Sequence, residues 1–310
     1  MGNVLAMFPG QGSQYVGMGK VVLENFPACK AVFEEAEDAT KINIRKLCFD
    51  GPEDQLTLTA NTQPCILTVS VATWQILKQE TGLTPTFYAG HSLGEYSANV
   101  AAEKLSLYNA AFLVRKRGEA MQEAVPQGVG AMAAVLKCPE SRLETECKTV
   151  SQNGKSVQVV NYNTEEQLVI AGHKVAVETV CKTLQAEQIR CVPLPVSAPF
   201  HSTLMEPARR KMEILLNATE FNQNPNKIIA NLTGKVEINY NREHLIKQVD
   251  NPVYWTQSVK TAVEKDVKTF IEIGPGKVLF GLLRRSLPRG EHKLITTDSD
   301  VKAAIEALQA

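Results

Sequence analysis

Short apolar runs alternate with stretches of helical periodicity in the first third of the chain. The apolar runs are VLAMF at 4–8 and TFYAG at 86–90, and the helix-period stretches cover 20–38, 64–79 and 93–103. Strands that alternate with helices are typical of an α/β layer, because each crossover helix covers one face of a parallel sheet. The pattern therefore predicts an α/β fold for this part of the chain.

Residues 128–198 follow a different order of short elements. Apolar and alternating runs predict strands, and two stretches of helical periodicity lie between them. The order is strand, helix, strand, strand, helix, strand, as in a ferredoxin-like βαββαβ unit. The segments are GAMAAVL, 139–149, SVQVVNY, QLVIAG, 174–187 and RCVPLPV. We therefore predict a small inserted domain at 127–199, with hinges in the Pro- and Gly-containing segments 124–130 and 193–199.

The remainder of the chain returns to the first pattern, so residues 1–126 and 200–310 are expected to form one α/β core around the insertion. The segment TFIEIGPGKVLFGLLRR predicts a strand, a glycine turn and a helix. Its glycines are not followed by Lys-Ser or Lys-Thr, and the chain contains no GxGxxG motif. The sequence therefore does not favour nucleotide binding.

The composition is that of a globular protein without an overall charge. Of 310 residues, 44% are hydrophobic, and 33 basic side chains balance 33 acidic ones. A neutral chain lacks the field that attracts nucleic acid or an anionic membrane, so neither is an expected partner. No apolar run approaches the roughly 18 residues that span a bilayer, and the first residues lack the basic start of a signal peptide.

The seven cysteines are scattered along the chain and form neither a CxxC pair nor a zinc-ligand spacing. Their odd number also argues against a disulfide framework. Reduced thiols and a cytoplasmic location are therefore expected, without a metal site.

Gly90-His91-Ser92-Leu93-Gly94 fits the pattern G-x-S-x-G between a predicted strand and a predicted helix. In that context the turn strains the serine, and the glycines let the strand and the helix approach each other. The Ser92 hydroxyl then projects into a cleft as a nucleophile. The alternative is a turn serine that caps the helix. The turn is also expected to direct the side chain of His91 away from the serine.

Arg117 lies on the apolar face of a helix predicted over 106–123. The other residues of that face are Leu107, Ala110, Ala111, Val114, Gly118 and Met121. A buried guanidinium without a partner costs on the order of several kcal/mol, so it must meet a carboxylate, either from the protein or from a ligand. If the carboxylate belongs to a ligand, Arg117 and Ser92 together indicate an acyl substrate with a free acid group.

His201 is the candidate general base for the serine. It follows PLPVSAPF, whose three prolines stiffen the approach to it. A general base needs such fixed positioning. The other histidines stand in a turn or among charged residues, apart from His91.

The segment FPGQGSQ at 8–14 follows the first predicted strand. Gly10 and Gly12 permit a backbone that aims the N–H of Gln11 into a cleft, and the N–H of Leu93 at a helix start is a second donor. Together they predict an oxyanion hole. The alternative is an ordinary loop between a strand and a helix.

Seven segments, in order, match a known family. They are FPGQGSQYVGMG, TQPCILTVSVA, GHSLGEYSA, RGEAMQEAVPQGVGAMAAV, VNYNTEEQLVIAGH, NPVYWTQSV and EIGPGKVL. Over nearly its whole length the chain resembles the bacterial malonyl-CoA:acyl carrier protein transacylases. The resemblance implies a hydrolase-like α/β core with a ferredoxin-like insert. It also implies an acyltransferase of fatty acid synthesis, monomeric and without a cofactor, with malonyl-CoA and acyl carrier protein as its partners.

The resemblance also implies roles for individual residues. Ser92 is expected to be the acylated nucleophile and His201 its base, and Arg117 is expected to clamp the malonyl carboxylate. The N–H groups of Gln11 and Leu93 are expected to form the oxyanion hole. A serine-histidine dyad thus replaces the usual triad.

Three further positions follow from the same resemblance. The backbone carbonyl of Gln248 is expected to orient the histidine, and Asn163 matches an asparagine of the active site. Phe200 precedes the histidine, where some bacterial relatives carry serine and malonyl-selective polyketide domains often carry phenylalanine. We expect its ring to crowd the α-carbon of the acyl group and to disfavour methylmalonyl.

Other functions stay open from the sequence. A serine thioesterase or esterase uses the same acyl-enzyme with water as acceptor, and a polyketide pathway can use the same malonyl loading. A third alternative is a non-catalytic module that binds a carrier protein. Arg284, Arg285 and Arg289 either meet an acidic partner or form a solvated helix end.

Overall fold

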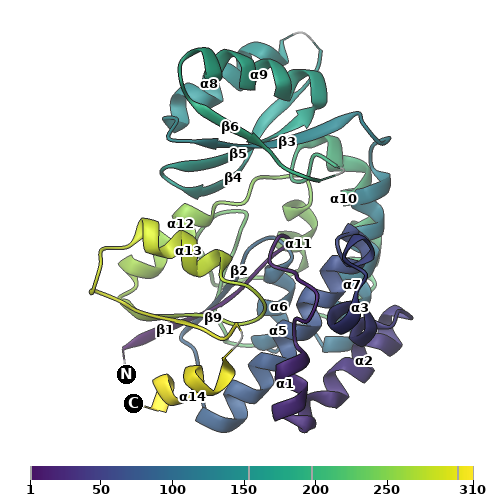
Figure 1. Ribbon diagram of the computed structural model, residues 1–310, viewed down its shortest axis with the longest axis vertical. Helices are drawn as coiled ribbons and strands as arrows, with labels where there is room; N and C mark the ends of the chain where they lie inside the picture. Colours follow the sequence, from purple (N-terminus) through teal and green to yellow (C-terminus); the bar gives the residue numbers. More distant parts are fainter. Residues whose placement is uncertain (1, 153, 197, 299, 310) are drawn as a thin grey trace.

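A mostly parallel six-stranded sheet forms the centre of the larger part of the molecule (Figure 1). The computed structural model describes residues 2–152, 154–196, 198–298 and 300–309. The strands lie in the order β10 (Lys293–Thr296), β9 (Val267–Glu272), β1 (Asn3–Phe8), β2 (Phe87–Gly90), β7 (Ile228–Ile229) and β8 (Val236–Glu237). Neighbouring strands are parallel except for the antiparallel edge pair of β7 and β8.

Helices cover both faces of this sheet. Ala6 and Phe8 of β1 join one hydrophobic cluster, while Leu5 and Met7 join another on the opposite face. Burial on both faces explains why the central strands are continuous apolar runs. The helices of the core are α1 (Lys20–Asn25), α2 (Lys30–Thr40), α3 (Ile44–Asp50), α4 (Glu53–Leu56), α5 (Thr59–Thr81), α6 (Gly94–Ala101), α7 (Leu107–Glu123), α10 (Glu206–Asn217), α11 (Arg242–Gln248), α12 (Trp255–Glu264), α13 (Val278–Ser286) and α14 (Val301–Gln309).

The helix-period stretch at 20–38 forms two helices instead of one. Pro27 lacks an N–H and restricts the residue before it, so Phe26 leaves the helical region, with φ of −132° and ψ of 75°. A short 3-10 turn (Pro27–Cys29) then leads into α2. The proline therefore separates α1 from α2 within one continuous apolar pattern.

The longest helix of the described ranges, α5, is buried along most of its length. It packs against α7 and α2 on one side of the sheet. None of the helices that the structure describes, α5 included, combines the length and apolar character needed to cross a membrane.

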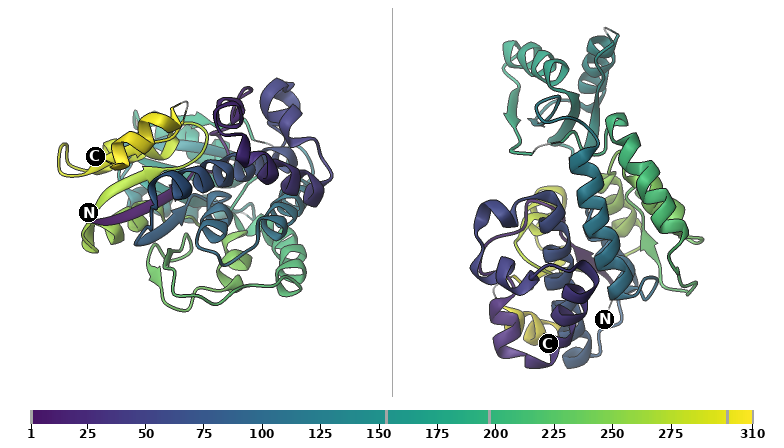
Figure 2. Two further views of the ribbon diagram at one scale, coloured as in Figure 1. Left: turned by 90° about the horizontal axis from the view of Figure 1, so that it is seen from below. Right: turned by 90° about the vertical axis from the view of Figure 1, so that its right-hand side faces the viewer.

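A four-stranded antiparallel sheet forms a separate, smaller unit above the core (Figures 1 and 2). Its strand order, β4-β5-β3-β6, is that of the ferredoxin-like fold, as predicted. One face packs against α8 and α9 around its own hydrophobic cluster. Its elements are β3 (Gly130–Leu136), α8 (Glu140–Ser151), β4 (Val157–Thr164), β5 (Gln167–His173), α9 (Lys174–Ala186) and β6 (Arg190–Pro193).

The other face of the small sheet is turned toward the core. Met132 and Ala134 of β3 and Val169 of β5 belong to the large cluster of the core, whereas Ala133 and Val135 belong to the small one. The alternation of side chains along β3 therefore joins the two units.

The hydrolase-like α/β core with a ferredoxin-like insert is thus the observed fold class. We propose that the insert spans 127–199 and the core 1–126 and 200–310. Residues 124–130 join α7 to β3, as expected of the first hinge. The second, 193–199, includes Ser197, which lies outside the described residues.

Candidate active site

Ser92 lies in the turn between β2 and α6 and has a positive φ of 52°. That conformation is uncommon for residues with a Cβ and is typical of strained functional positions. The glycines are required by close packing: a Cβ on Gly90 would lie 2.0 Å from the backbone of Gly94, and one on Gly94 would lie 2.0 Å from the Phe8 carbonyl oxygen. The expected strand–turn–helix is therefore present, and Ser92 does not cap α6.

The Ser92 hydroxyl faces His201. Ser92 Oγ lies 2.7 Å from His201 Nε2, and His201 Nδ1 lies 2.8 Å from the backbone carbonyl oxygen of Gln248. Because a carbonyl oxygen can only accept, Nδ1 carries the proton, and Nε2 is left to accept the proton of the serine. This is the tautomer that a general base requires.

The surroundings of His201 keep its ring neutral. The side chain is only 3% exposed. Burial, followed by the nearby positive charge of Arg117, lowers the pKa of His201 to about 3. The ring is therefore unprotonated at neutral pH and can accept a proton.

Arg117 is a buried cation held by neutral oxygens. Its Nη1 donates to Gln63 Oε1 at 3.0 Å, and its Nη2 donates to Ser92 Oγ at 3.1 Å and to Gln248 Oε1 at 2.9 Å. The guanidinium also lies over the ring of Tyr96. These contacts place the cation directly beside the serine hydroxyl.

No carboxylate among the described residues pairs with the Arg117 guanidinium, and its Nε is buried without a hydrogen-bond partner. The expected alternative, a pair with a protein acid, is therefore wrong. Burial lowers the pKa of Arg117, as desolvation of an incompletely matched cation should. The site thus lacks the anion that this arginine calls for.

Two free backbone donors border the same space. Within the described ranges, neither the N–H of Gln11 nor that of Leu93 makes a hydrogen bond. Both residues line the cavity that contains Ser92. This arrangement agrees with the predicted oxyanion hole rather than with an ordinary loop.

Seven of the eight predicted site residues line one cavity of about 190 Å³, which are Gln11, Ser92, Leu93, Arg117, Asn163, Phe200 and His201. The eighth, Gln248, is fully buried directly behind it. The small sheet supplies apolar side chains to the same cavity, among them Met132 and Val169. The cavity therefore lies between the two units.

Asn163 does not contact the serine or His201 in the described hydrogen bonds. Its Oδ1 lies 2.9 Å from Nε2 of His91, whose ring also packs against Trp255. His91 lines the cavity as well. The expectation that the turn directs His91 away from this space is therefore wrong.

Two residues of the site had no signal in the sequence. Gln63 binds Arg117, and the Oδ1 of Asn231 accepts from the backbone N–H of Ser92 at 2.7 Å. Gln63 is a polar residue in an otherwise buried helix, a pattern that could have marked it. Asn231 stands in no recognisable motif.

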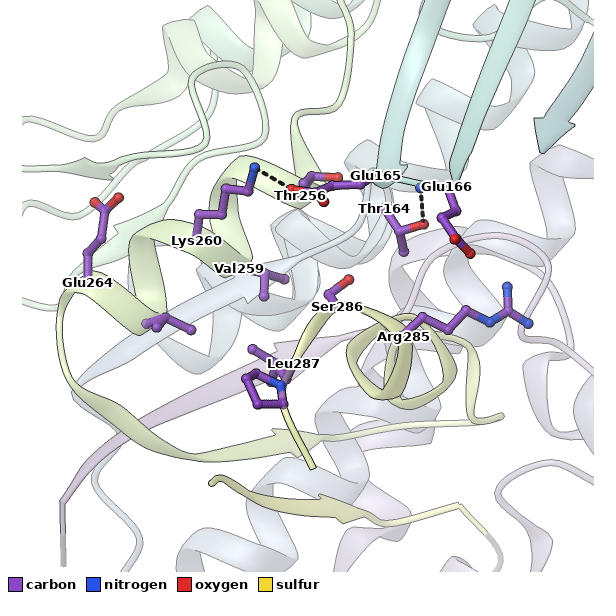
Figure 3. Close-up of a pocket in the computed structure, with 12 residues that line it drawn as sticks. Thr164, Glu165, Glu166, Thr256, Val259, Lys260, Glu264, Arg285, Ser286 and Leu287 are labelled. Atoms are coloured by element: carbon purple, nitrogen blue, oxygen red, sulfur yellow. Dashed lines mark hydrogen bonds and ion pairs between the residues drawn. The ribbon is translucent and has the colours of Figure 1, made fainter. Parts of the chain in front are cut away.

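A larger cavity of about 460 Å³ lies elsewhere, between the turn of β4 and β5 and the helices α12 and α13 (Figure 3). Its charges are matched internally, since Lys260 Nζ lies 2.9 Å from Glu165 Oε1. Arg285 donates to Gln167, which also borders the smaller cavity. The catalytic groups lie in the smaller cavity, so the larger one is not the candidate active site.

Acyl transfer through a serine ester needs a nucleophile, a base and donors for an oxyanion. An α/β core that presents such groups to one cavity defines the chain as an enzyme of the acyltransferase class. Residues 6–304 match the family described as the acyl transferase domain. The chain belongs to this family, and the resemblance expected from its sequence is confirmed.

Similar proteins narrow the family further. Malonyl CoA-acyl carrier protein transacylase of Bacillus subtilis strain 168 is 42% identical, over 100% of this chain and 98% of that protein. The solved structure of the transacylase of Xanthomonas oryzae has a TM-score of 0.94 and 35% identity, with 98% of each chain covered. A malonyl-transacylase solved in complex with a type II polyketide acyl carrier protein has a TM-score of 0.92 and 38% identity, with 99% of each chain covered.

The lowered pKa of His201 predicts a pH-dependent stability. The folded protein favours the neutral ring, whereas the unfolded chain takes up a proton below the ordinary pKa of 6.5, so unfolding is favoured as the pH falls from 6.5 toward 3. At pH 5 this contribution is about 2 kcal/mol. His201→Gln should remove it.

Urea unfolding at pH 8 and pH 5 measures the effect as the loss in free energy of unfolding between the two pH values. This loss should be smaller in His201→Gln than in the wild type by about 2 kcal/mol. An equal loss in both proteins would contradict the neutral, buried state of His201.

Proposed function

We propose that this chain transfers the malonyl group of malonyl-CoA to the phosphopantetheine thiol of acyl carrier protein, as a step of fatty acid chain elongation. The observation that carries the proposal is Arg117, a buried cation without an acid partner that donates to Ser92 Oγ at 3.1 Å. A serine ester formed at this point has a guanidinium within reach of a carboxylate at its far end. The names of the similar proteins support the same substrate.

In the proposed first half-reaction, Ser92 Oγ attacks the thioester carbonyl while Nε2 of His201 takes the hydroxyl proton. The carbonyl of Gln248, 2.8 Å from Nδ1, orients the ring and stabilises its protonated form. The tetrahedral oxyanion lies between the N–H groups of Gln11 and Leu93. Collapse of this intermediate breaks the C–S bond, the thiolate of coenzyme A takes the proton from His201, and a malonyl-serine ester remains.

The second half-reaction reverses these steps with another thiol. His201 takes the proton of the phosphopantetheine thiol, and the sulfur attacks the ester carbonyl. The C–O bond breaks, and Ser92 recovers its proton from the histidine. The mechanism is ping-pong, because coenzyme A leaves before the carrier protein reacts.

The guanidinium of Arg117 selects the acyl group in this proposal. A charge-assisted hydrogen bond to a carboxylate is roughly twice as strong as a neutral one, and the planar guanidinium can bind both carboxylate oxygens. Asn163 and His91, paired at 2.9 Å, border the same cavity. We infer that they contact the pantetheine or acyl part of the substrate.

The proposed reaction involves only these two substrates. None of its steps needs a metal or a redox cofactor. We further propose a cytoplasmic monomer without nucleic acid or membrane partners, because 33 basic and 33 acidic residues leave no net charge.

A malonyl-loading role in a polyketide pathway is the second candidate. It is favoured by the similarity to a malonyl-transacylase solved with a polyketide carrier protein. The catalytic steps are the same for both carriers. Transfer rates to fatty-acid and polyketide carrier proteins therefore distinguish the two pathways.

The central test is intact mass spectrometry after exposure to malonyl-CoA. We expect a stable malonyl adduct that peptide mapping places on Ser92 and that disappears when carrier protein with its phosphopantetheine arm is added. Ser92→Ala should carry no adduct. Rapid release of free malonate without carrier protein would instead indicate a thioesterase, and an adduct on another residue would contradict the proposed nucleophile.

Removal of the guanidinium should change the choice of acyl group. Arg117→Ala should slow malonyl transfer by roughly 10- to 100-fold, the effect of one lost charge-assisted bond, and should slow acetyl transfer much less. Arg115→Ala is the matched control, because Arg115 lies on the same helix but pairs with Glu119. Equal losses for both acyl groups in Arg117→Ala would show that this residue is not the carboxylate clamp.

Phe200 is 8% exposed and lines the cavity, so a smaller side chain there enlarges the space beside the serine. Phe200→Ser should raise the rate with methylmalonyl-CoA relative to malonyl-CoA by about 10-fold, the usual effect of one methyl group. Phe200→Leu, which retains most of the bulk, should stay near the wild-type ratio. An unchanged ratio in Phe200→Ser would exclude the crowding role.

A further inference from the structure

Glu95 is a buried acid for which the mechanism has no use. It lies in the first turn of α6, three residues after Ser92, and is 0% exposed. Its carboxylate accepts from the side-chain amide of Gln248, from Tyr240 OH at 3.1 Å and from the backbone N–H of Asn231 at 3.2 Å. A carboxylate at this depth costs stability unless its hydrogen bonds are specific, so its position asks for a function.

Gln248 connects this acid to the arginine. Its Nε2 donates to Glu95 and, at 3.0 Å, to the backbone carbonyl of Ser92, while its Oε1 accepts from Arg117 at 2.9 Å. A guanidinium only donates, and an ionised carboxylate only accepts. The two charges therefore fix the direction of the amide between them.

Asn231 forms a second connection from Glu95 to the serine. Its backbone N–H donates to Glu95, and its side chain accepts from the N–H of Ser92 and donates to the carbonyl of Gly90. Both backbone groups of Ser92 are thus held by residues that bind Glu95. This contact set maintains the positive φ of the serine.

The amide between the two charges has a chemical consequence. An acid in direct contact with Arg117 would satisfy the guanidinium and compete with a substrate carboxylate. A neutral amide leaves one end of the guanidinium oriented and the rest of its donors unmatched, as the unpartnered Nε shows. The negative charge of Glu95 therefore supports the arginine without occupying its donors.

We propose that Glu95 is a positioning residue for acyl selection: it fixes the direction of the Gln248 amide, which in turn orients Arg117 for the carboxylate of the incoming acyl group. This inference rests on the proposed malonyl transfer. Glu95 itself does not contact the substrate. Its effect on selection must therefore pass through Gln248 and Arg117.

Burial raises the pKa of Glu95 to about 7, against the opposing hydrogen bonds of Gln248, Asn231 and Tyr240 and the positive charge of Arg117. A raised pKa of an acid means that the carboxylate is ionised above that value. The relay is therefore complete at pH 8, and the test should be made there.

The test compares rates of Ser92 acylation by malonyl-CoA and acetyl-CoA at pH 8, measured by rapid quenching and mass spectrometry. In Glu95→Gln the new amide presents a donor to the Gln248 amide and favours its reversal, so the malonyl-to-acetyl ratio should fall by about 10-fold or more. Adding Glu95→Gln to Arg117→Ala should not lower the ratio further, because the two residues act as one unit.

Glu272→Gln is the matched control. Glu272 is also 0% exposed, and it accepts from the N–H groups of Leu279 at 3.0 Å and Phe280 at 2.7 Å at the start of α13, away from the arginine. This variant should lose stability on heating but keep the ratio within about twofold of the wild type. A change in ratio confined to Glu95→Gln therefore reports positioning rather than general loosening of the core.

A second variant keeps the inference testable if Glu95→Gln does not fold. Gln248→Met removes both ends of the amide and retains the backbone carbonyl that faces His201, and it should lower the ratio to a similar extent. An unchanged ratio in either variant, with both acyl rates reduced equally, would overturn the positioning role. An unchanged ratio in Arg117→Ala alone would instead overturn the carboxylate clamp of the proposed function.

Discussion

The burial of one guanidinium without an acid partner is the constraint on which the rest of the site depends. Arg117 is held by neutral oxygens from Gln63, Gln248 and Ser92, so its positive charge acts undiminished on its neighbours. That charge adds to burial in keeping His201 unprotonated. The same feature that suits a substrate carboxylate therefore also maintains the base in its active form.

The cavity owes its character to the meeting of two units. The α/β core supplies the polar groups, and the open face of the ferredoxin-like sheet supplies apolar side chains such as Met132 and Val169. A small apolar enclosure excludes water, which strengthens each hydrogen bond and charge interaction within it. The insert therefore completes the site, although it provides neither the serine nor the histidine.

Several site residues could be predicted because each leaves a local mark on the sequence. Ser92 stands in a strained turn between glycines, and Arg117 interrupts an apolar helix face. His201 follows three prolines. Gln63, Asn231 and the network of Glu95 could not be predicted, because their roles arise from contacts across the fold: Asn231 is 139 positions from the serine that it holds.

The amino-acid sequence by itself determined the secondary elements, the order of the ferredoxin-like unit and the position of the strained serine, because periodicity, glycine and proline act over a few neighbouring residues. It left open whether the buried arginine meets an acid of the protein. Only the tertiary structure decided that point, since it places a neutral glutamine between Arg117 and Glu95. Electrostatic pairing depends on distances of a few ångströms between remote segments, and these exist only after the chain has folded.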